Sequence, residues 1–276
     1  MSAAEASGGF NPAPGGALSP PAKPLADRIF MWVLWFVLAA SLTASFLPAE
    51  VWRAPELVTS AGNLSDYASG FVHPNFHRVM SYLAGMGLTL AIAVWGTTIS
   101  VLIGAPLSLL CANNIAPVWI AQPFRRIADV LRSINDLVYA VLFVTAVGIG
   151  PFAGVMAVAM ASAGVIAKLF SESIETIDPK PVEGVRAVGA TRVQEILFGI
   201  LPQVAPLWSS LALYRFESNV RSATVLGIVG AGGIGQSLLE EMRGFHYEET
   251  AAIVIVIIIT VFSIDAASSA IRKRLV

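Results

Sequence analysis

Apolar runs long enough to cross a lipid bilayer recur along this chain, and they constrain its fold more than any other feature. A helix needs about 20 predominantly apolar residues to span the hydrocarbon core. Hydrophobic residues make up 56% of the sequence and charged residues only 13%, against roughly 25% charged in an ordinary globular domain. The sequence therefore predicts an all-α integral membrane protein with about six transmembrane helices. The expected spans cover residues 29–47, 82–111, 127–149, 152–170, 196–214 and 250–271.

Composition also excludes several other classes of protein. The net charge of −1 gives no basic surface for nucleic acid. The single cysteine, Cys111, cannot form an intramolecular disulfide or a Cys-based metal site. Residues 2–24 are rich in Ala, Gly, Ser and Pro and too poor in large apolar groups to fold alone. We therefore expect a disordered cytoplasmic tail over residues 1–28 and a transmembrane domain over residues 29–276, whose first span is retained rather than cleaved.

The distribution of Lys and Arg predicts which side each loop faces, because cytoplasmic loops carry an excess of basic residues. Placing both termini in the cytoplasm puts most basic residues inside and five outside. The charged segment 171–195 is then a cytoplasmic loop, and 48–81 and 215–249 face outward. The inner residues are Lys23, Arg28, Arg125, Arg126, Arg132, Lys168, Lys180, Arg186, Arg192, Arg272, Lys273 and Arg274; the outer residues are Arg53, Arg78, Arg215, Arg221 and Arg243.

The stretch from Lys168 to Pro202 is the longest run of mixed charge in the chain. Pro179 and Pro181 are expected to end the preceding helix, and a short helix restarts at Val182 with Glu183 in its first turn. Such a helix fits a docking element on the membrane surface, although an ordinary charged inner loop remains the alternative. The charged residues expected to form its solvated, two-signed surface are Glu172, Glu175, Asp178, Lys180, Glu183, Arg186, Arg192 and Glu195.

Other charged or metal-ligating residues give weaker signals. His73 and His77 stand at i, i+4 spacing, but Pro74 lies between them and a third ligand is lacking, so no metal site is expected. A series of alternating charges spaced along one helix face, from Arg125 to Asp136, predicts ion pairs at the inner interface.

The motif Glu183-Gly184-Val185-x-x-x-Gly189, followed by Leu201-Pro202, resembles the signature loop of ABC importer permeases. That family reads Glu-Ala-Ala, three residues, Gly, nine residues, Ile, one residue, Leu-Pro. This chain has Gly184 and Val185 in place of the alanines and Gly199 in place of Ile, with the spacing kept. The resemblance implies a coupling helix seated in a groove of a cytoplasmic ATPase dimer. The residues implied to make this contact are Glu183, Gly184, Arg186, Ala187 and Gly189.

Further segments between residues 80 and 276 are similar to the phosphonate-uptake branch of these permeases. They include Gly148 to Gly154, Lys168 to Glu175, Tyr214 to Ala223 and Gly230 to Gly235. The resemblance implies a permease subunit, paired as a homodimer in the inner membrane. It implies two ATPase subunits, which bind ATP and Mg, and an outer-face binding protein that delivers phosphonate, phosphate or phosphite. No cofactor is expected in this chain itself.

The glycine-rich segment at 230–235 fits the G-x-G-x-x-G fingerprint, but the βαβ context that gives this fingerprint meaning is missing. Glycine turns expose backbone N–H groups to anions, and guanidinium groups match phosphonate oxygens. One hypothesis therefore makes 215–235 part of the outer gate and the anion's route. The alternative is a structural turn whose arginines pair with Glu217, Glu240 or Glu241. The residues of the hypothetical path are Arg215, Asn219, Arg221, Ser222, Gly230, Gly232 and Gly233.

The resulting prediction is the permease subunit of an ATP-driven importer for a phosphorus oxyanion, without catalytic residues of its own. A permease for another cargo, such as an amino acid, is one alternative. A stand-alone secondary transporter or channel is a second, and it needs intramembrane ionisable groups, for which Asp136, Glu217 and Asp265 are the candidates. A membrane enzyme is a third, for which the sequence offers no convincing nucleophile–base pair.

Overall fold

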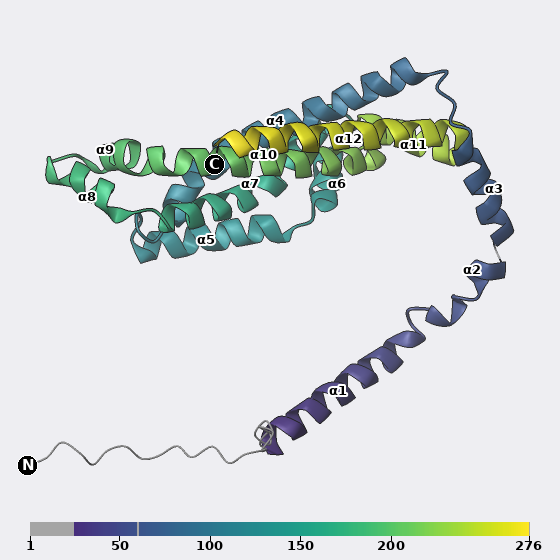
Figure 1. Cartoon of the computed structure of the whole chain (residues 1–276), viewed down its shortest axis with the longest axis horizontal. Coiled ribbons are helices and arrows are strands. Elements are labelled where there is room, and N and C mark those ends of the chain that lie inside the picture. The colour runs from purple at the N-terminus through teal and green to yellow at the C-terminus, as the bar shows by residue number, and fades with distance from the viewer. Residues whose placement is uncertain (1–24, 60, 276) are drawn as a thin grey trace, which may run out of the picture. The chain divides into compact units, whose positions relative to one another are not determined.

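The structure, a computed structural model, describes residues 25–59 and 61–275, and every regular element in that part of the chain is helical (Figure 1). The α-helices are α1 (Leu25–Phe46), α2 (Glu56–Thr59), α3 (Ala61–Val72), α4 (Val79–Cys111), α5 (Val118–Ser133), α6 (Asp136–Val147), α7 (Pro151–Glu175), α8 (Pro179–Ala187), α9 (Arg192–Gln194), α10 (Leu201–Leu226), α11 (Ile234–Arg243) and α12 (Tyr247–Leu275). Short 3-10 turns cover Val51–Arg53 and Gly227–Val229, and a π-helical segment covers Glu195–Ile200.

Five helical stretches among the described residues are long and apolar enough to cross a membrane, and a bent pair raises the number to six. The five stretches are Asp27–Phe46, Val79–Cys111, Pro151–Glu175, Arg192–Val229 and Tyr247–Arg274. The bent pair is α5 with α6. The prediction of about six spans in an all-helical chain is therefore confirmed in number and kind.

The third expected span, 127–149, is not one straight helix. Helices α5 and α6 meet at an angle of 86°. The break occurs because Ile134 and Asn135 leave the helical conformation and Asn135 caps the new helix, its Oδ1 accepting a hydrogen bond from the Leu137 N–H at 2.9 Å. Helix α5 also begins at Val118, nine residues before the expected start, because its sequence is amphipathic rather than uniformly apolar.

Small residues let the central helices approach one another closely. A Cβ atom added at Gly96 would lie 2.6 Å from Val158 Cγ1, and one at Gly104 would lie 2.7 Å from Ile166 Cγ2. These contacts join α4 to α7, and α7 also packs against α5, α6 and α10. Close approach at glycine is the usual means by which membrane helices gain packing energy. Gly96 and Gly104 of the second expected span therefore serve helix packing.

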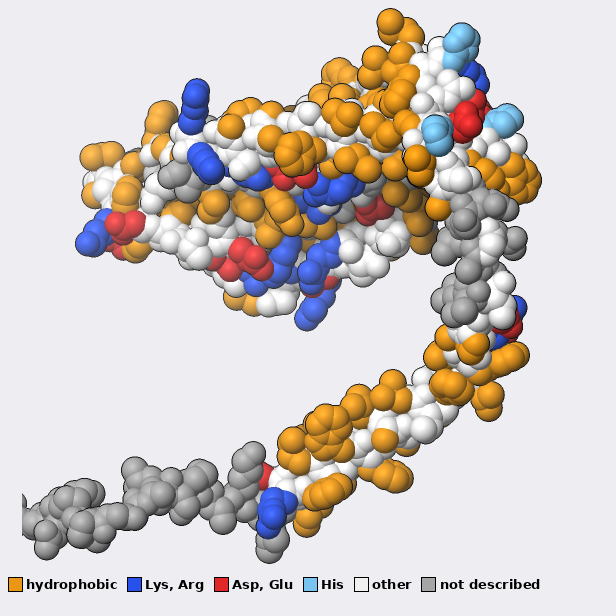
Figure 2. Space-filling view, turned by 45° about the vertical axis from the view of Figure 1, so that its right-hand side comes forward, with side chains coloured by type: hydrophobic (Ala, Val, Ile, Leu, Met, Phe, Trp, Pro, Cys, Tyr) orange, Lys and Arg blue, Asp and Glu red, His pale blue; other side chains and the backbone are white. Residues whose placement is uncertain are grey.

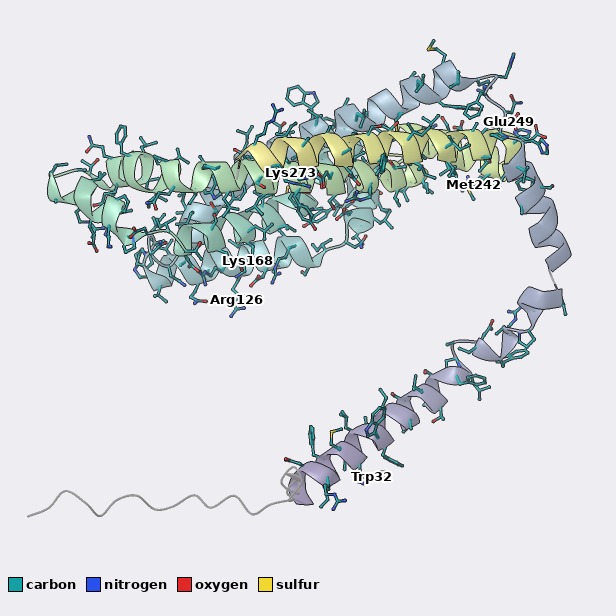
Figure 3. The ribbon with its side chains drawn as sticks, viewed as in Figure 1. Trp32, Arg126, Lys168, Met242, Glu249 and Lys273 are labelled. Carbon is teal, nitrogen blue, oxygen red and sulfur yellow. The ribbon has the colours of Figure 1, made fainter. Side chains whose placement is uncertain are left out.

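The bundle has two different ends. Helices α8 and α9 lie at one end, past the end of α12, and α11 lies at the other (Figure 1); we call these the α8 end and the α11 end. Met242 and Glu249 lie at the α11 end, away from Arg126 and Lys168 (Figure 3). Apolar side chains cover much of the visible flank of the helices (Figure 2).

Ion pairs join three segments at the α11 end. The buried Glu241 carboxylate accepts from Arg78 Nη1 at 2.8 Å and lies 2.8 Å from His246 Nδ1. Asn75 Nδ2 donates to Glu249 Oε1 at 3.0 Å. These contacts tie the start of α4 to the turn between α11 and α12. Groups of three or more potential metal ligands are not found within 25–59 and 61–275.

The chain divides into two compact units, residues 1–64 and 65–276. The described part of the first unit consists mainly of α1, whose side chains are exposed along its length, including Trp32 at 77% and Phe36 at 74%. The length of this helix, 22 residues, matches the thickness of a bilayer, and its exposed apolar side chains suit contact with lipid. The expected tail at 1–28 falls mostly outside the described residues.

Candidate functional site

In the sequence, the short helix α8 lies between α7 and the long helical stretch that begins at Arg192. It starts at Pro179, three residues before the expected start, because Asp178 caps it through a hydrogen bond from the Lys180 N–H at 3.0 Å. Proline at the first helical position needs no N–H partner. Glu183 therefore lies beyond the first turn, and the prediction that it occupies that turn is wrong.

Gly189 ends α8. Its φ of +84° lies in the left-handed region, and its N–H donates to the Arg186 carbonyl at 3.0 Å. A residue in this conformation commonly closes a helix C-terminus, and glycine adopts it without steric cost. This backbone requirement explains why glycine stands at this position of the motif.

The predicted contact residues of α8 are exposed, and one of them, Arg186, also contacts the following helical stretch. Glu183, Gly184 and Ala187 are exposed, and a Cβ atom added at Gly184 would meet no atom within 4 Å. The Arg186 guanidinium reaches the Glu195 carboxylate, with Nε–Oε1 at 2.8 Å and Nη2–Oε2 at 3.0 Å. The hydrogen bond to Glu195 raises the pKa of Arg186 above its ordinary value, so this side chain is charged at physiological pH.

Two of the predicted path residues belong to a polar network inside the bundle. Asn219 is buried; its Oδ1 accepts from Ser162 Oγ at 2.7 Å, and its Nδ2 donates to Thr97 Oγ1 at 2.9 Å. Arg215 Nη2 donates to Ser162 Oγ at 3.0 Å. The network joins α4, α7 and α10 around the buried side chain of Asn219. Ser162 was not predicted as a site residue. In the sequence it is marked only as a lone serine within the apolar span 152–170.

Arg221 and Ser222 lie where α10 meets α6 and α12. Arg221 Nη1 contacts both Asp265 carboxylate oxygens at 3.1 Å, and both side chains are roughly half exposed. Ser222 Oγ donates to Asp136 Oδ2 at 2.6 Å. A cavity of about 370 Å³ opens here, lined by Asn135, Asp136, Leu137, Arg221, Ser222, Val225 and Leu226.

The three candidate carboxylates for a stand-alone transporter all lie among the described residues, and each has a polar partner there. Asp136 accepts from Ser222 and Asp265 pairs with Arg221. Glu217 lies 2.7 Å from Arg272 Nη1, with its side chain 7% exposed. The two ion pairs cross-link α10 and α12 with charges of alternating sign.

The segment 215–249, which was expected to be an outer loop, is largely helical. Helix α10 continues through Leu226, and α11 occupies Ile234–Arg243. The prediction of a loop over this whole segment is wrong because the charges that lowered its hydropathy are paired with neighbouring helices. The structural alternative paired Arg215 and Arg221 with Glu217, Glu240 or Glu241. In the structure Arg215 donates to Ser162 and Arg221 pairs with Asp265 instead.

The glycine-rich turn is confined to residues 227–233 and is packed against its neighbours. Gly230, Gly232 and Gly233 have φ values of +94°, +77° and +81°. A Cβ atom added at Gly233 would lie 2.4 Å from Thr89 Oγ1, and Thr89 Oγ1 also accepts from the Ile234 N–H at 2.9 Å. The geometry requires glycine for backbone conformation and for close approach to α4.

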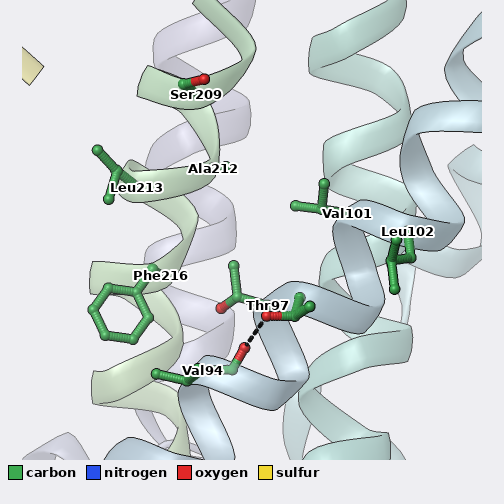
Figure 4. Close-up of a pocket in the computed structure, with 9 residues that line it drawn as sticks. Val94, Thr97, Val101, Leu102, Ser209, Ala212, Leu213 and Phe216 are labelled. Atoms are coloured by element: carbon green, nitrogen blue, oxygen red, sulfur yellow. Dashed lines mark hydrogen bonds between the residues drawn. The ribbon is translucent and has the colours of Figure 1, made fainter. Parts of the chain in front are cut away.

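An apolar groove of about 500 Å³ runs between α4 and α10, with side chains from both helices directed into it (Figure 4). Its polar groups are few; among them, the Thr98 hydroxyl donates to the Val94 carbonyl within α4 at 2.8 Å. The lining residues are Val94, Thr97, Thr98, Val101, Leu102, Ser209, Ala212, Leu213 and Phe216. Thr97 connects this groove to the Asn219 network.

Known proteins resemble this chain in sequence and in fold. The family described as binding-protein-dependent transport system inner membrane component matches residues 104–276. The phosphite transport system permease protein PtxC of Stutzerimonas stutzeri is 38% identical over 222 residues, covering 80% of this chain and 81% of that protein. The phosphate-import permease protein PhnE of Mycolicibacterium smegmatis is 38% identical over 259 residues, covering 92% of this chain and 48% of that protein.

A solved structure shares the fold. A chain from a structure of inward-facing conformations of the MetNI methionine ABC transporter superimposes with a TM-score of 0.65 at 24% sequence identity. The match covers 72% of this chain and 99% of that chain. At this identity the likeness concerns the arrangement of the helices.

Proposed function

Because the chain belongs to the family of binding-protein-dependent transport system inner membrane components, we propose that it is the permease subunit of an ATP-driven importer for a phosphorus oxyanion. The observation that carries the proposal is α8, a short polar helix with Glu183 and Gly184 exposed, standing at one end of the bundle. A motor outside this chain would press on that helix, and the spans would respond by opening toward one side of the membrane or the other.

The cargo proposal is supported by the relatives, which are described as permeases for phosphite and phosphate. These oxyanions share a tetrahedral phosphorus that carries at least three oxygens, and guanidinium groups bind such oxygens bidentately. The partners proposed are a cytoplasmic ATPase dimer, which binds ATP and Mg, and an outer-face binding protein. The chain itself carries no catalytic group or cofactor in this proposal, and both of its termini face the cytoplasm.

Reconstitution tests this function. The chain, its ATPase and its binding protein in liposomes should take up phosphite, phosphate or methylphosphonate only when ATP is supplied. A variant lacking residues 182–190 should insert normally and lose uptake, because the force from the ATPase no longer reaches the spans. Uptake by the purified chain alone would instead indicate a secondary transporter or channel, and uptake that persists without residues 182–190 would refute the role of α8.

We place the anion's route beside the cavity that contains Arg221 and Ser222. Arg221→Ala should lower uptake at limiting substrate. Among the residues that line this cavity, Arg221 is the one with a positively charged side chain, and its guanidinium is half-exposed. Arg126→Ala is the matched control, since Arg126 is 79% exposed on α5 and lines none of the described cavities. Unchanged uptake in an assembled Arg221→Ala complex would count against this route.

We also propose that two copies of the chain pair in the complex, with the path between them. Two copies carrying different affinity tags should then co-purify from the same membrane. Recovery of each tagged copy without the other would exclude the homodimer and would favour pairing with a different permease chain.

A further inference from the structure

Glu195 is a carboxylate held inside the α8 end of the bundle, although the charge pattern predicts that it is solvated. Its side chain is 7% exposed. Two guanidinium groups bind it, Arg186 through Nε and Nη2 and Arg192 through Nη1 at 3.1 Å. A buried carboxylate must be paired to be stable. Its position is therefore fixed by these two arginines.

The two arginines belong to different parts of the chain. Arg192 stands three residues before Glu195 in the same helical stretch, and its side chain is 72% exposed. Arg186 comes from α8, across the turn at Gly189. Its two parallel N–H···O bonds fix the angle between the two groups as well as their distance. The Arg186–Glu195 pair therefore joins two elements, whereas the Arg192–Glu195 pair joins only neighbours in one element.

A second contact fixes α8 against the same segment. A Cβ atom added at Gly199 would lie 3.1 Å from Val182 Cα, which is tighter than side-chain contacts normally allow. Val182 also packs on the apolar cluster of Ala112, Ile174, Ile200 and Val204. The glycine that replaces the motif's isoleucine thus lets α8 lie directly on the helix that follows it.

The segment that receives both contacts is the π-helix Glu195–Ile200, which leads into α10 at Leu201-Pro202. Pro202 has no N–H and its ring would collide with the carbonyl four residues earlier, so the turn before it widens. Glu195 and Gly199 both lie in this widened turn, and α10 carries Arg215 and Asn219 farther along. A displacement of this turn is therefore a displacement of the base of α10.

We propose that Arg186 and Glu195 form a clamp that makes α8 and the base of α10 move as one body, so that motion imposed on α8 is delivered to α10. The inference rests on the proposed function, since it concerns how force from an ATPase reaches the spans. Both residues act as positioning residues. Arg186, whose side chain is 55% exposed, is thus assigned to the contact with Glu195, while Glu183, Gly184 and Ala187 remain exposed for a partner.

The test compares Arg186→Ala and Glu195→Ala with Arg192→Ala in the reconstituted complex. The quantity measured is substrate imported per ATP hydrolysed, with phosphate as the probe. Loss of the clamp should lower this ratio about tenfold in the first two variants, within the range of measured coupling between sites. Arg192→Ala, which removes a partner from the same helical stretch as Glu195, should stay within about twofold of the unmodified chain. The Arg186→Ala/Glu195→Ala double variant should lose no more than the worse single variant.

A second measurement needs neither substrate nor ATPase. Spin labels at Val188→Cys and Ser209→Cys report the distance between α8 and α10, since both positions are exposed and Cys111 is buried. Arg186→Ala should broaden the distribution of this distance, and Arg192→Ala should leave it unchanged. Equal distributions and equal coupling ratios in the two variants would overturn the clamp.

The outcomes separate the two proposals. If no ATPase co-purifies with the unmodified chain, the proposed function fails whatever the distances show. If the ATPase co-purifies and Arg186→Ala couples as well as the unmodified chain, only the clamp fails.

Discussion

Alanine should have opposite effects on the stability of α8 at two of its glycines, Gly184 within the helix and Gly189 just after it. Gly189 has a φ of +84°, whereas Gly184 has helical geometry and open space at the Cβ position. A left-handed conformation costs a non-glycine residue about 1–2 kcal/mol. Alanine in place of glycine inside an exposed helix instead stabilises it by about 0.8–1 kcal/mol.

Gly189→Ala should therefore loosen α8, and Gly184→Ala should tighten it. Hydrogen exchange of the backbone amides of residues 179–187 measures both effects. Exchange should become roughly 5–30-fold faster in Gly189→Ala, the factor that corresponds to 1–2 kcal/mol. Exchange in Gly184→Ala should be slower than in the unmodified chain. Equal rates in the two variants would contradict the assignment of Gly189 as the residue that ends the helix.

Asn219 provides a second test at the scale of a residue. Asn219→Ala removes hydrogen bonds to Thr97 and Ser162 and should lower the free energy of unfolding by about 1–3 kcal/mol, since buried hydroxyls lose their partners. Thr98→Ala is the control, because its exposed hydroxyl bonds only within α4; it should change stability by less than about 0.5 kcal/mol. Thermal unfolding in detergent measures both, and similar midpoints would show that the network does not stabilise the bundle.

Among the elements, the π-helix before Pro202 depends on that proline. Pro202→Ala restores an N–H and removes the ring, so the widened turn can close as an ordinary α-helix. The register between Gly199 and Val182 would then shift, and transport should fall several-fold with normal insertion. Pro206→Ala is the control, because Pro206 lies inside the regular helix α10. A Pro202→Ala variant as active as Pro206→Ala would separate the π-helix from coupling.

The elements also show what a sequence can and cannot reveal. Apolar runs located most of the spans, and Pro179 with Pro181 indicated a break before a short helix, because these signals are local; that helix begins at Pro179 rather than at Val182. The break between α5 and α6 is capped locally by Asn135, but it lies within a run apolar enough to suggest one continuous span. The helical course of 215–226 depends on partners distant in sequence. Asp265, for example, neutralises Arg221 from 44 residues away. Hydropathy alone counts such charges as signs of a loop.

The same reason explains the parts of the candidate site that were not anticipated. In the sequence, Glu195 cannot be told from the other charges of the predicted solvated surface. The structure shows it buried and paired with two arginines. Ser162 and Thr97 carried no motif, and their role follows from the buried amide that they share. Gly184 and Gly189 were predicted to be small residues at a partner's surface, which stays a prediction; for Gly189 the structure adds a backbone reason for glycine, a φ of +84°.

At the scale of the whole molecule, the helical stretch Arg192–Val229 is longer than a bilayer is thick. Its 38 residues extend over roughly 57 Å at 1.5 Å per residue, while the hydrocarbon core measures about 30 Å. The stretch is therefore long enough to extend beyond the hydrocarbon core, and Glu195 and the neighbouring α8 lie at its N-terminal end. This length allows a motor in the aqueous phase to act on a helix that also crosses the lipid.

The central claim is that α8 seats against an ATPase subunit that this chain lacks. Photocrosslinking from position 188 tests it most directly, because the Val188 side chain is 84% exposed just after α8. Position 245 at the α11 end, where Phe245 is 73% exposed, is the control. In intact membranes a photoreactive residue at 188 should attach to the ATPase and one at 245 should not. Attachment from 188 only to lipid or to the chain's own helices would contradict the account.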